Sequence, residues 1–276
     1  MCATETTIGR MKIGDKLLFG AYGVSNDDPH PILWLKGTPN GDFITQDVVD
    51  YIAFDARERN SESYSIRNWG NSSYPHSNIL SFLNSGNSQW WFATHPNDES
   101  PDDNGYALRD RRFGYASHFG FLYHFEDYET SAIVLQEITV GDAAIQALIR
   151  LPSFDDILGP ERFKLFSKKG VRAHGTSDFF DGRGIRLGFS PESFIEFWLS
   201  SPSPQDDGKA TIVSRSATFQ KQYPYAGSGL RPVCTLRPDT VVELDDNGVF
   251  HVKPSELDRK VFTDDELMAL LGMARP

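Results

Sequence analysis

The sequence Phe-Trp-Leu-Ser-Ser-Pro at residues 197–202, together with Gly-Leu-Arg-Pro-Val-Cys-Thr-Leu at residues 229–236, decides the expected fold of this chain. Both contain a short continuous apolar run, which is typical of a buried strand. The residues between them are rich in Ser, Gln, Lys, Tyr and Gly. We therefore expect a surface-exposed excursion that leaves a sheet and returns to it. Polar and aromatic residues that a rigid sheet holds on loops are the usual composition of a binding surface.

The excursion supplies six candidate ligand contacts: Arg215, Phe219, Gln220, Lys221, Tyr223 and Tyr225. Tyrosine and arginine give a large contact area and adaptable hydrogen bonding at modest entropic cost. The alternative carries equal weight: the two tyrosines and Phe219 simply cover the end of the sheet. Arg231, at a strand entry, is expected to be structural and to bond carbonyls or a carboxylate. Trp198 is expected in the core.

Composition places the chain among soluble globular proteins. It has 276 residues, 39% of them hydrophobic, with 20 Phe, 10 Tyr and 5 Trp, which is ample for an aromatic-rich core. The formal net charge is −11, and the basic clusters at 109–112 and 168–169 are short, so we expect no nucleic-acid partner. No apolar run approaches the length of a membrane span.

The ends and cysteines of the chain lead to further expectations. The first seven residues show no apolar stretch of the kind found in signal peptides, so we expect cytoplasmic synthesis, with release inside a virus particle as one route outward. Cys234 lies in an apolar run and is expected to be a buried free thiol rather than the disulfide partner of Cys2.

The local patterns predict one folded domain over residues 10–252, with a flexible segment over 1–9 and a linker with an amphipathic helix over 253–276. Strands are expected within 13–22, at 32–36 and in a hairpin over 241–252. Short helices are expected after the caps Ser77 and Ser153, and helical patterns or starts at 142–149 and 190–193. The C-terminal helix either packs on its own domain or docks on a partner chain through Leu267, Leu270 and Leu271.

The ordered motifs resemble those of a bacterial and phage family defined only as a domain of unknown function. The matching segments are Gly14–Gly20, Asn78–Asn84, Leu151–Ile157, Phe197–Pro202 and Gly229–Val233. The series covers about residues 10–240. The helix at 78–84 lacks the family's tryptophan, Ser200 stands where the family has arginine, and the segment from about 87 to 130 has no counterpart.

That family is similar to the C-type-lectin-like fold, which formylglycine-generating enzymes and diversified ligand-binding proteins of phages share. The resemblance implies an α+β fold with a small, mainly antiparallel sheet, short helices and long loops. It also implies a ligand surface built on loops. Because fold does not determine function, the step from this resemblance to binding is an analogy.

The sequence offers little support for catalysis, a metal or a cofactor. Formylglycine chemistry requires neighbouring reactive cysteines, and Cys234 has none nearby in sequence. The acidic run at 97–105 could supply calcium ligands, but it does not fit an EF-hand register and is more typical of a solvated loop. No histidine pair has the helical spacing of a zinc site, and no phosphate-binding loop or Gly-x-Ser-x-Gly motif occurs. We therefore expect no metal and no cofactor.

Three functions remain open. The leading hypothesis is a non-enzymatic ligand-binding or display protein, such as a phage tail, fibre or head decoration component that recognises a surface glycan or protein receptor. The alternative is a hydrolase or modifying enzyme that acts on carbohydrate or peptide, since a pair of carboxylates cannot be selected or dismissed by sequence. The third is a structural subunit whose aromatic loops contact other virion or assembly subunits.

Overall fold

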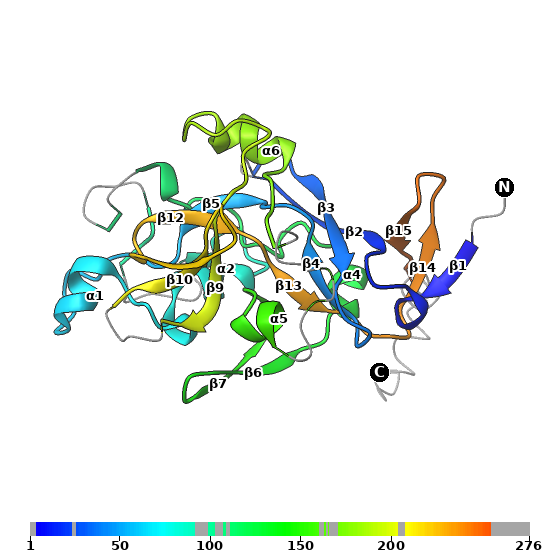
Figure 1. Ribbon diagram of the computed structural model, residues 1–276, viewed down its shortest axis with the longest axis horizontal. Coiled ribbons are helices and arrows are strands. Elements are labelled where there is room, and N and C mark those ends of the chain that lie inside the picture. Colours follow the sequence, from blue (N-terminus) through cyan, green and yellow to red (C-terminus); the bar gives the residue numbers. More distant parts are fainter. Residues whose placement is uncertain are drawn as a thin grey trace, which may run out of the picture.

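The computed structural model describes residues 4–23, 26–91, 99–102, 107–108, 111–159, 163, 165, 171–203 and 208–254. Two sheets and a separate hairpin form the framework, and short helices and long connections join their strands (Figure 1). Most strand pairs are antiparallel, whereas β9–β12 and β2–β15 are parallel. The chain therefore has the mixed α+β character that its sequence predicts.

The larger sheet has eight strands and crosses the middle of the molecule to the end that carries the N-terminus (Figure 1). Its strands, in spatial order, are β1 (Thr4–Thr7), β14 (Val241–Leu244), β15 (Val249–Val252), β2 (Lys16–Tyr22), β3 (His30–Lys36), β4 (Asp42–Thr45), β13 (Val233–Thr235) and β8 (Ile149–Arg150). Gly41 allows the β3–β4 turn with a φ of 94°. The sequence predicts a small sheet, and this one is larger because the C-terminal hairpin and β1 extend it.

The second sheet holds the polar excursion. Its strands, in spatial order, are β11 (Phe219–Gln222), β10 (Ala210–Val213), β9 (Phe197–Pro202), β12 (Gly227–Leu230) and β5 (Asp50–Ala53). The first framing segment forms β9, as predicted, whereas the second covers the end of β12 in this sheet and β13 in the larger sheet. The excursion forms β10 and β11, and β11 is the edge strand of this sheet next to β10.

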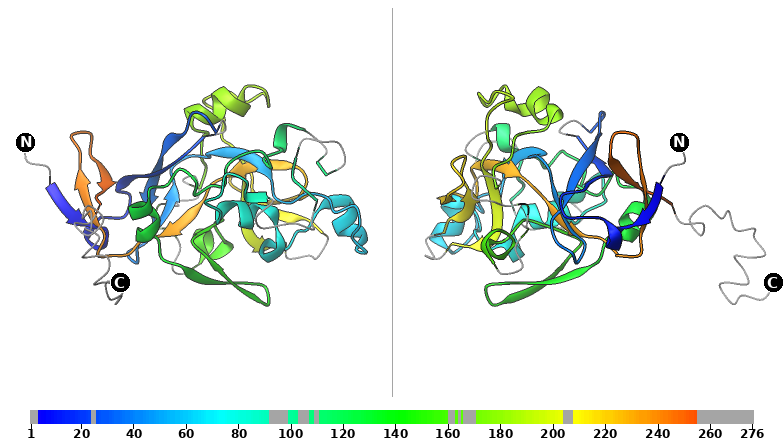
Figure 2. Two further views of the ribbon diagram at one scale, coloured as in Figure 1. Left: turned by 180° about the vertical axis from the view of Figure 1, so that it is seen from behind. Right: turned by 45° about the vertical axis from the view of Figure 1, so that its right-hand side comes forward.

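The remaining elements are short. The hairpin of β6 (Gln136–Val140) and β7 (Ala143–Ala147) lies at the lower rim in each view (Figures 1 and 2). The helices are α1 (Tyr64–Trp69), α2 (Asn78–Leu83), α4 (Asp127–Ala132), α5 (Phe154–Leu158) and α6 (Ser177–Phe179). Single turns of 3-10 helix occur at Ile8–Arg10, Tyr74–His76 and Arg111–Phe113, and a π-helical turn at Phe180–Gly184.

The framing strands are apolar on both faces because a separate core covers each face. Trp198 belongs to a first core, with Ile52, Ala210 and Cys234. Its neighbours Phe197 and Leu199 belong to a second core, with Tyr51, Val213 and Val233. Since successive side chains of a strand point to opposite faces, a continuous apolar run is what two covered faces require.

Local signals predicted several elements correctly. Ser77 caps α2 by accepting a hydrogen bond from Leu80 N, and Ser153 caps α5 in a capping box with Asp156. The hairpin over 241–252 forms as β14 and β15. Cys234 is a buried free cysteine, and Trp198 is fully buried.

Three predictions differ from the structure. Residues 142–149 form β7 and the start of β8, not a helix, because β7 pairs along its length with β6 across a turn at Gly141. Residues 190–193 form a turn, closed by Ser193 N donating to Ser190 O, and no helix follows. The segment expected to be flexible over 1–9 includes β1, which pairs with β14.

The linker after Lys253 and the predicted C-terminal helix lie outside the described residues from 255 onward. No helix within the described ranges combines the length and the apolar character that crossing a bilayer requires.

Candidate functional site

A polar hollow of about 460 Å³ lies beside β11, which we call the β11 groove. The turn between β10 and β11, the strands themselves and the residue before β9 build it. Its lining residues are Glu196, Ile212, Ser214, Arg215, Ser216, Gln220, Lys221 and Gln222. Hollows of this size fall within the range of about 300–1,000 Å³ that is usual for ligand sites.

Arg215 is held in place at the groove by two neighbours. Its Nε donates to Glu196 Oε2 at 2.5 Å and its guanidinium lies 4.5 Å from the centre of the Phe189 ring. The side chain remains 56% exposed. Arg215 is therefore positioned before any ligand arrives and still faces the groove.

Glu196 is anchored on its other side by Tyr51, whose hydroxyl donates to Glu196 Oε1 at 2.6 Å. Partial burial raises the pKa of Glu196, but the hydrogen bonds from Arg215 and Tyr51 outweigh it and hold the pKa below its usual value. Burial, reinforced by the nearby Glu196 charge, raises the pKa of the Tyr51 hydroxyl. Glu196 is thus an ionised, fully engaged carboxylate at neutral pH.

The turn that presents Arg215 is tightly bonded. Ser214 N donates to Thr218 O at 2.8 Å, and Ser214 Oγ lies 2.8 Å from Thr218 Oγ1 and 3.0 Å from Ser216 Oγ. Ala217 has a φ of 60°, a left-handed conformation that is uncommon for residues other than glycine. Such backbone strain persists only where the surroundings impose it, and it often occurs at binding sites.

Four rings form an aromatic row between α1 and the end of β11. The row consists of Tyr64, Trp69, Tyr223 and Tyr225, with successive ring centres 5.9, 5.4 and 5.7 Å apart. Tyr225 N donates to Trp69 O, which joins the two segments. The outer end is open, since Tyr64 is 66% exposed, whereas Tyr225 is only 8% exposed.

Two cations border the aromatic row. Lys209 Nζ lies 5.0 Å from the centre of the Tyr223 ring, and the Arg57 guanidinium lies 5.2 Å from that of Tyr225. Lys209 also lines a hollow of about 440 Å³ that the β6–β7 turn closes on its far side. The end of the sheet near α1 is therefore aromatic and cationic.

The structure divides the six predicted ligand residues among three environments. Arg215, Gln220 and Lys221 line the groove, and Tyr223 and Tyr225 belong to the aromatic row. Phe219 lies apart, edge-on to Phe154 with ring centres 4.8 Å apart, and is 37% exposed. The six residues therefore do not all share one surface.

The other predicted docking residues, Leu267, Leu270 and Leu271, lie outside the described residues, as does most of the acidic run at 97–105. Within the ranges that the structure describes, no three or more His, Cys, Asp or Glu side chains are arranged to hold a metal ion.

Arg231 is a structural residue, as predicted. It is 2% exposed, and its guanidinium donates to the carbonyl oxygens of Thr45, Gln46 and Val171 at 3.1, 3.2 and 2.9 Å. Burial lowers the pKa of Arg231 to about 10. Trp90 and Trp91 are both buried.

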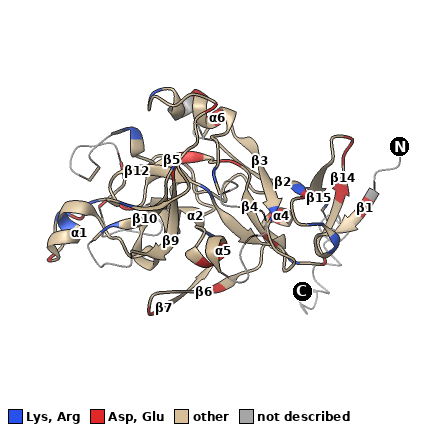
Figure 3. Cartoon of the chain, in the orientation of Figure 1, with Lys and Arg blue, Asp and Glu red and all other residues tan. Residues whose placement is uncertain are grey.

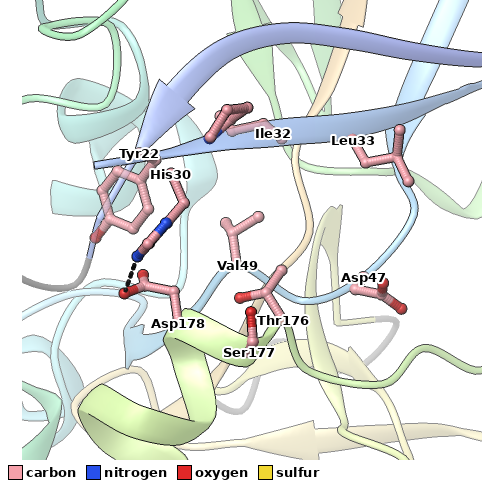
Figure 4. A pocket seen from close by; sticks show the side chains of 10 residues that line it. Tyr22, His30, Ile32, Leu33, Asp47, Val49, Thr176, Ser177 and Asp178 are labelled. Atoms are coloured by element: carbon pink, nitrogen blue, oxygen red, sulfur yellow. Dashed lines mark ion pairs between the residues drawn. The ribbon is translucent and has the colours of Figure 1, made fainter. Parts of the chain in front are cut away.

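A second cavity, of about 220 Å³, lies between β3 and the start of α6, and we call it the β3–α6 cavity (Figure 4). Its polar lining comprises His30, Asp47, Thr176, Ser177 and Asp178, and its apolar lining includes Ile32, Leu33 and Val49. His30 Nε2 lies 3.6 Å from Asp178 Oδ1 and 3.5 Å from Asp28 Oδ2.

Tyr22 connects the wall of this cavity with a buried polar cluster. Its hydroxyl donates to Asp50 Oδ2 at 2.6 Å and lies 3.1 Å from His118 Nδ1. Asp50 is fully buried and also accepts a hydrogen bond from Tyr51 N. The carboxylate of Asp50 therefore lies behind the tyrosine that lines the cavity.

Sequence reasoning missed the β3–α6 cavity entirely. Its residues come from four segments, near positions 22, 31, 48 and 177, and none of these lining residues stands in a recognisable motif. The sequence predicted two members of the aromatic row, Tyr223 and Tyr225, as ligand contacts. It did not predict Tyr64 and Trp69, which lie about 155 residues earlier in the chain. A pattern within one segment cannot reveal which distant segment packs beside it.

A family model described as Domain of unknown function (DUF6273) matches residues 42–238. Neither the curated proteins nor the solved structures yielded a match.

Proposed function

The chain belongs to the family described as Domain of unknown function (DUF6273), and we propose that it is a non-enzymatic binding protein whose β11 groove recognises a glycan. The observation that carries this proposal is the groove itself. Arg215, Gln220 and Lys221 line it, which are three of the six residues that the sequence predicts as ligand contacts.

The lining chemistry favours a glycan over a protein receptor. Hydroxyls of Ser214 and Ser216, side-chain amides of Gln220 and Gln222 and the exposed guanidinium of Arg215 can donate to and accept from sugar hydroxyls. Ile212 is the one aliphatic residue in the described lining. Protein interfaces usually depend on a buried aromatic or aliphatic anchor, and this groove offers little space for one.

The aromatic row extends the same surface. Gln222 lines the groove, and the next residue, Tyr223, lies in the row. Exposed tyrosine and tryptophan rings combine apolar area with a polar tip, which suits ligands with both apolar and hydroxyl faces. Lys and Arg are spread over several elements from α1 to β2 (Figure 3), and those near this end of the sheet include Lys209 and Arg57.

Binding is favoured over hydrolysis at this groove. Glycoside hydrolysis requires two carboxyl groups, one of them with a raised pKa so that it can act as an acid. Glu196 is the one carboxylate in the described lining, and its pKa is lowered. It therefore serves to hold Arg215 and Tyr51 in position.

A glycan array and binding to intact bacterial cells would test the proposal with the purified chain. We expect Gln220→Ala to weaken glycan binding about tenfold, since a neutral hydrogen bond contributes about 0.5–1.5 kcal/mol. Gln146→Ala, on the exposed face of β7, is the matched control and should leave binding unchanged. A wild-type chain that binds no glycan would reject the function, and an unaffected Gln220→Ala variant would reject the groove.

The proposal also covers the fold family of the domain and the particle in which it acts. We propose that the domain is C-type-lectin-like and acts in a phage particle as a tail, fibre or head decoration protein, made in the cytoplasm and released with the virion. The mainly antiparallel sheets, short helices and long connections are consistent with that fold. Mass spectrometry of purified particles from a lysogen that encodes the chain would detect it, and its absence from particles would reject a virion role.

A further inference from the structure

The β3–α6 cavity is preformed by backbone hydrogen bonds around it. Val48 N donates to His174 O at 2.8 Å, and Thr176 N donates to Val48 O at 3.0 Å. Gln46 N donates to Leu33 O at 2.8 Å. These bonds, with the pairing of β2 and β3, join the four segments that supply the lining, so the cavity does not depend on a ligand for its shape.

The cavity is small and has both polar and apolar walls. Its volume of about 220 Å³ is below the range of about 300–1,000 Å³ usual for drug-sized ligands. Ile32 and Val49 offer an apolar surface, and Thr176 and Ser177 offer hydroxyls (Figure 4). Such a space suits a compact molecule with a short hydrocarbon part and a few hydrogen-bonding groups.

The charge around the cavity is negative. Asp178 and Asp47 lie at opposite ends of the view in Figure 4, and the described lining contains no lysine or arginine. Asp28 borders the cavity next to His30, and buried Asp50 lies behind Tyr22. Outside the lining, the Arg231 guanidinium lies near Asp47.

We propose that the β3–α6 cavity is a second binding site, distinct from the β11 groove, for a small protonated amine. The ammonium group would bind Asp178 at the His30 end, where its charge complements the carboxylate. Further donors on the ligand would reach Asp47 and the hydroxyls of Thr176 and Ser177. The hydrocarbon part would pack on Ile32 and Val49.

Isothermal titration of the full chain at pH 7.5 with putrescine and with glucosamine tests this site. N-acetylglucosamine is the neutral match for glucosamine. At least one of the two amines should bind. If glucosamine binds, it should bind more tightly than N-acetylglucosamine. Affinity should fall as ionic strength rises, because the attraction is between charges.

Matched variants locate the binding. Asp178→Asn and Asp47→Asn preserve shape and remove charge, and we expect each to weaken amine binding about tenfold or more, since hydrogen bonds to charged groups contribute about 1.5–3 kcal/mol. Asp239→Asn, at an exposed position, is the control. Gln220→Ala should leave amine binding unchanged, which separates this site from the glycan groove.

Three outcomes would overturn the proposal: neither amine binds, the acetylated sugar binds as well as glucosamine, or both aspartate variants retain wild-type affinity. Circular dichroism of each variant verifies that it is folded. Should Asp178→Asn fail to fold, Asp47→Asn and the acetylated sugar still decide the question.

Discussion

Gly229 and Arg231 show at the residue scale why the segment before β13 has its sequence. A Cβ at Gly229 would lie 2.5 Å from the backbone oxygen of Glu196 and 2.9 Å from a methyl of Val48. The absence of a side chain lets β12 lie beside β9 at this point. Arg231 then donates to three backbone carbonyls, those of Thr45, Gln46 and Val171.

Replacing Gly229 with alanine should destabilise the fold by about 1–3 kcal/mol, because overpacking against fixed backbone forces a local shift. Urea unfolding followed by circular dichroism measures the change. Gly86→Ala is the matched control, since a Cβ there meets nothing closer than 4.0 Å. Equal stability of Gly229→Ala and the wild type would show that the two strands can separate without cost.

At the element scale, the correct predictions rested on signals that neighbouring residues carry. Ser77 and Ser153 cap their own helices, and the β14–β15 turn needs only its local Asp and Gly residues. The segment 142–149 misled because its alanines suit a helix, whereas its pairing with β6 decided the outcome. The sequence of a segment does not by itself show which other strand it will pair with.

The start of α5 permits a prediction about pH. Arg150 donates to both carboxylate oxygens of Asp156 at 2.5 and 2.9 Å, and Asp156 also accepts from Ser153 N. Burial raises the pKa of Asp156, but the charge and hydrogen bonds of Arg150, with those of Ser153, more than offset it and lower the pKa. The pair therefore stabilises the fold fully above the unfolded-state pKa of about 4, and the stabilisation is lost as pH falls below it.

Asp156→Asn should accordingly cost about 3–5 kcal/mol at pH 7, because Arg150 loses its partner while 12% exposed. The difference from the wild type should shrink as pH falls below 4. Denaturant unfolding at pH 7, 5 and 3 checks both points. Asp155→Asn, at the neighbouring exposed position, is the control. A pH-independent difference would assign the loss to the helix cap and not to the ion pair.

Tyr223 and Tyr225 of the aromatic row differ in burial, so we expect their substitutions to have different effects. Tyr223 is half-buried, whereas Tyr225 is buried in the first core. Tyr223→Ala should weaken glycan binding by about 1–3 kcal/mol with little loss of stability. Tyr225→Ala should instead destabilise the fold by about 3–5 kcal/mol, since it leaves a cavity. Binding and urea titrations on both variants distinguish these effects, and a reversed pattern would exclude Tyr223 from the ligand surface.

At the scale of the whole molecule, the five-stranded sheet lies between two cores. The first core contains or contacts Trp34, Trp69, Trp90, Trp91 and Trp198. The second core contains phenylalanines and aliphatic residues, and Leu199 lies fully buried within it. This division follows from the apolar run of β9, which could be recognised from sequence. The partners on each face could not, because they come from segments throughout the chain.

Because both cores share the same strands, we expect them to unfold together. Leu199→Ala removes side-chain contacts from the second core and should cost about 2–5 kcal/mol. Its effect should appear equally in tryptophan fluorescence, which reports the first core, and in far-ultraviolet circular dichroism, which reports the backbone. Leu135→Ala, at a position 55% exposed, controls for the substitution itself. A Leu199→Ala variant whose fluorescence midpoint stays at the wild-type value while the dichroism midpoint falls would show that the two cores are separate cooperative units.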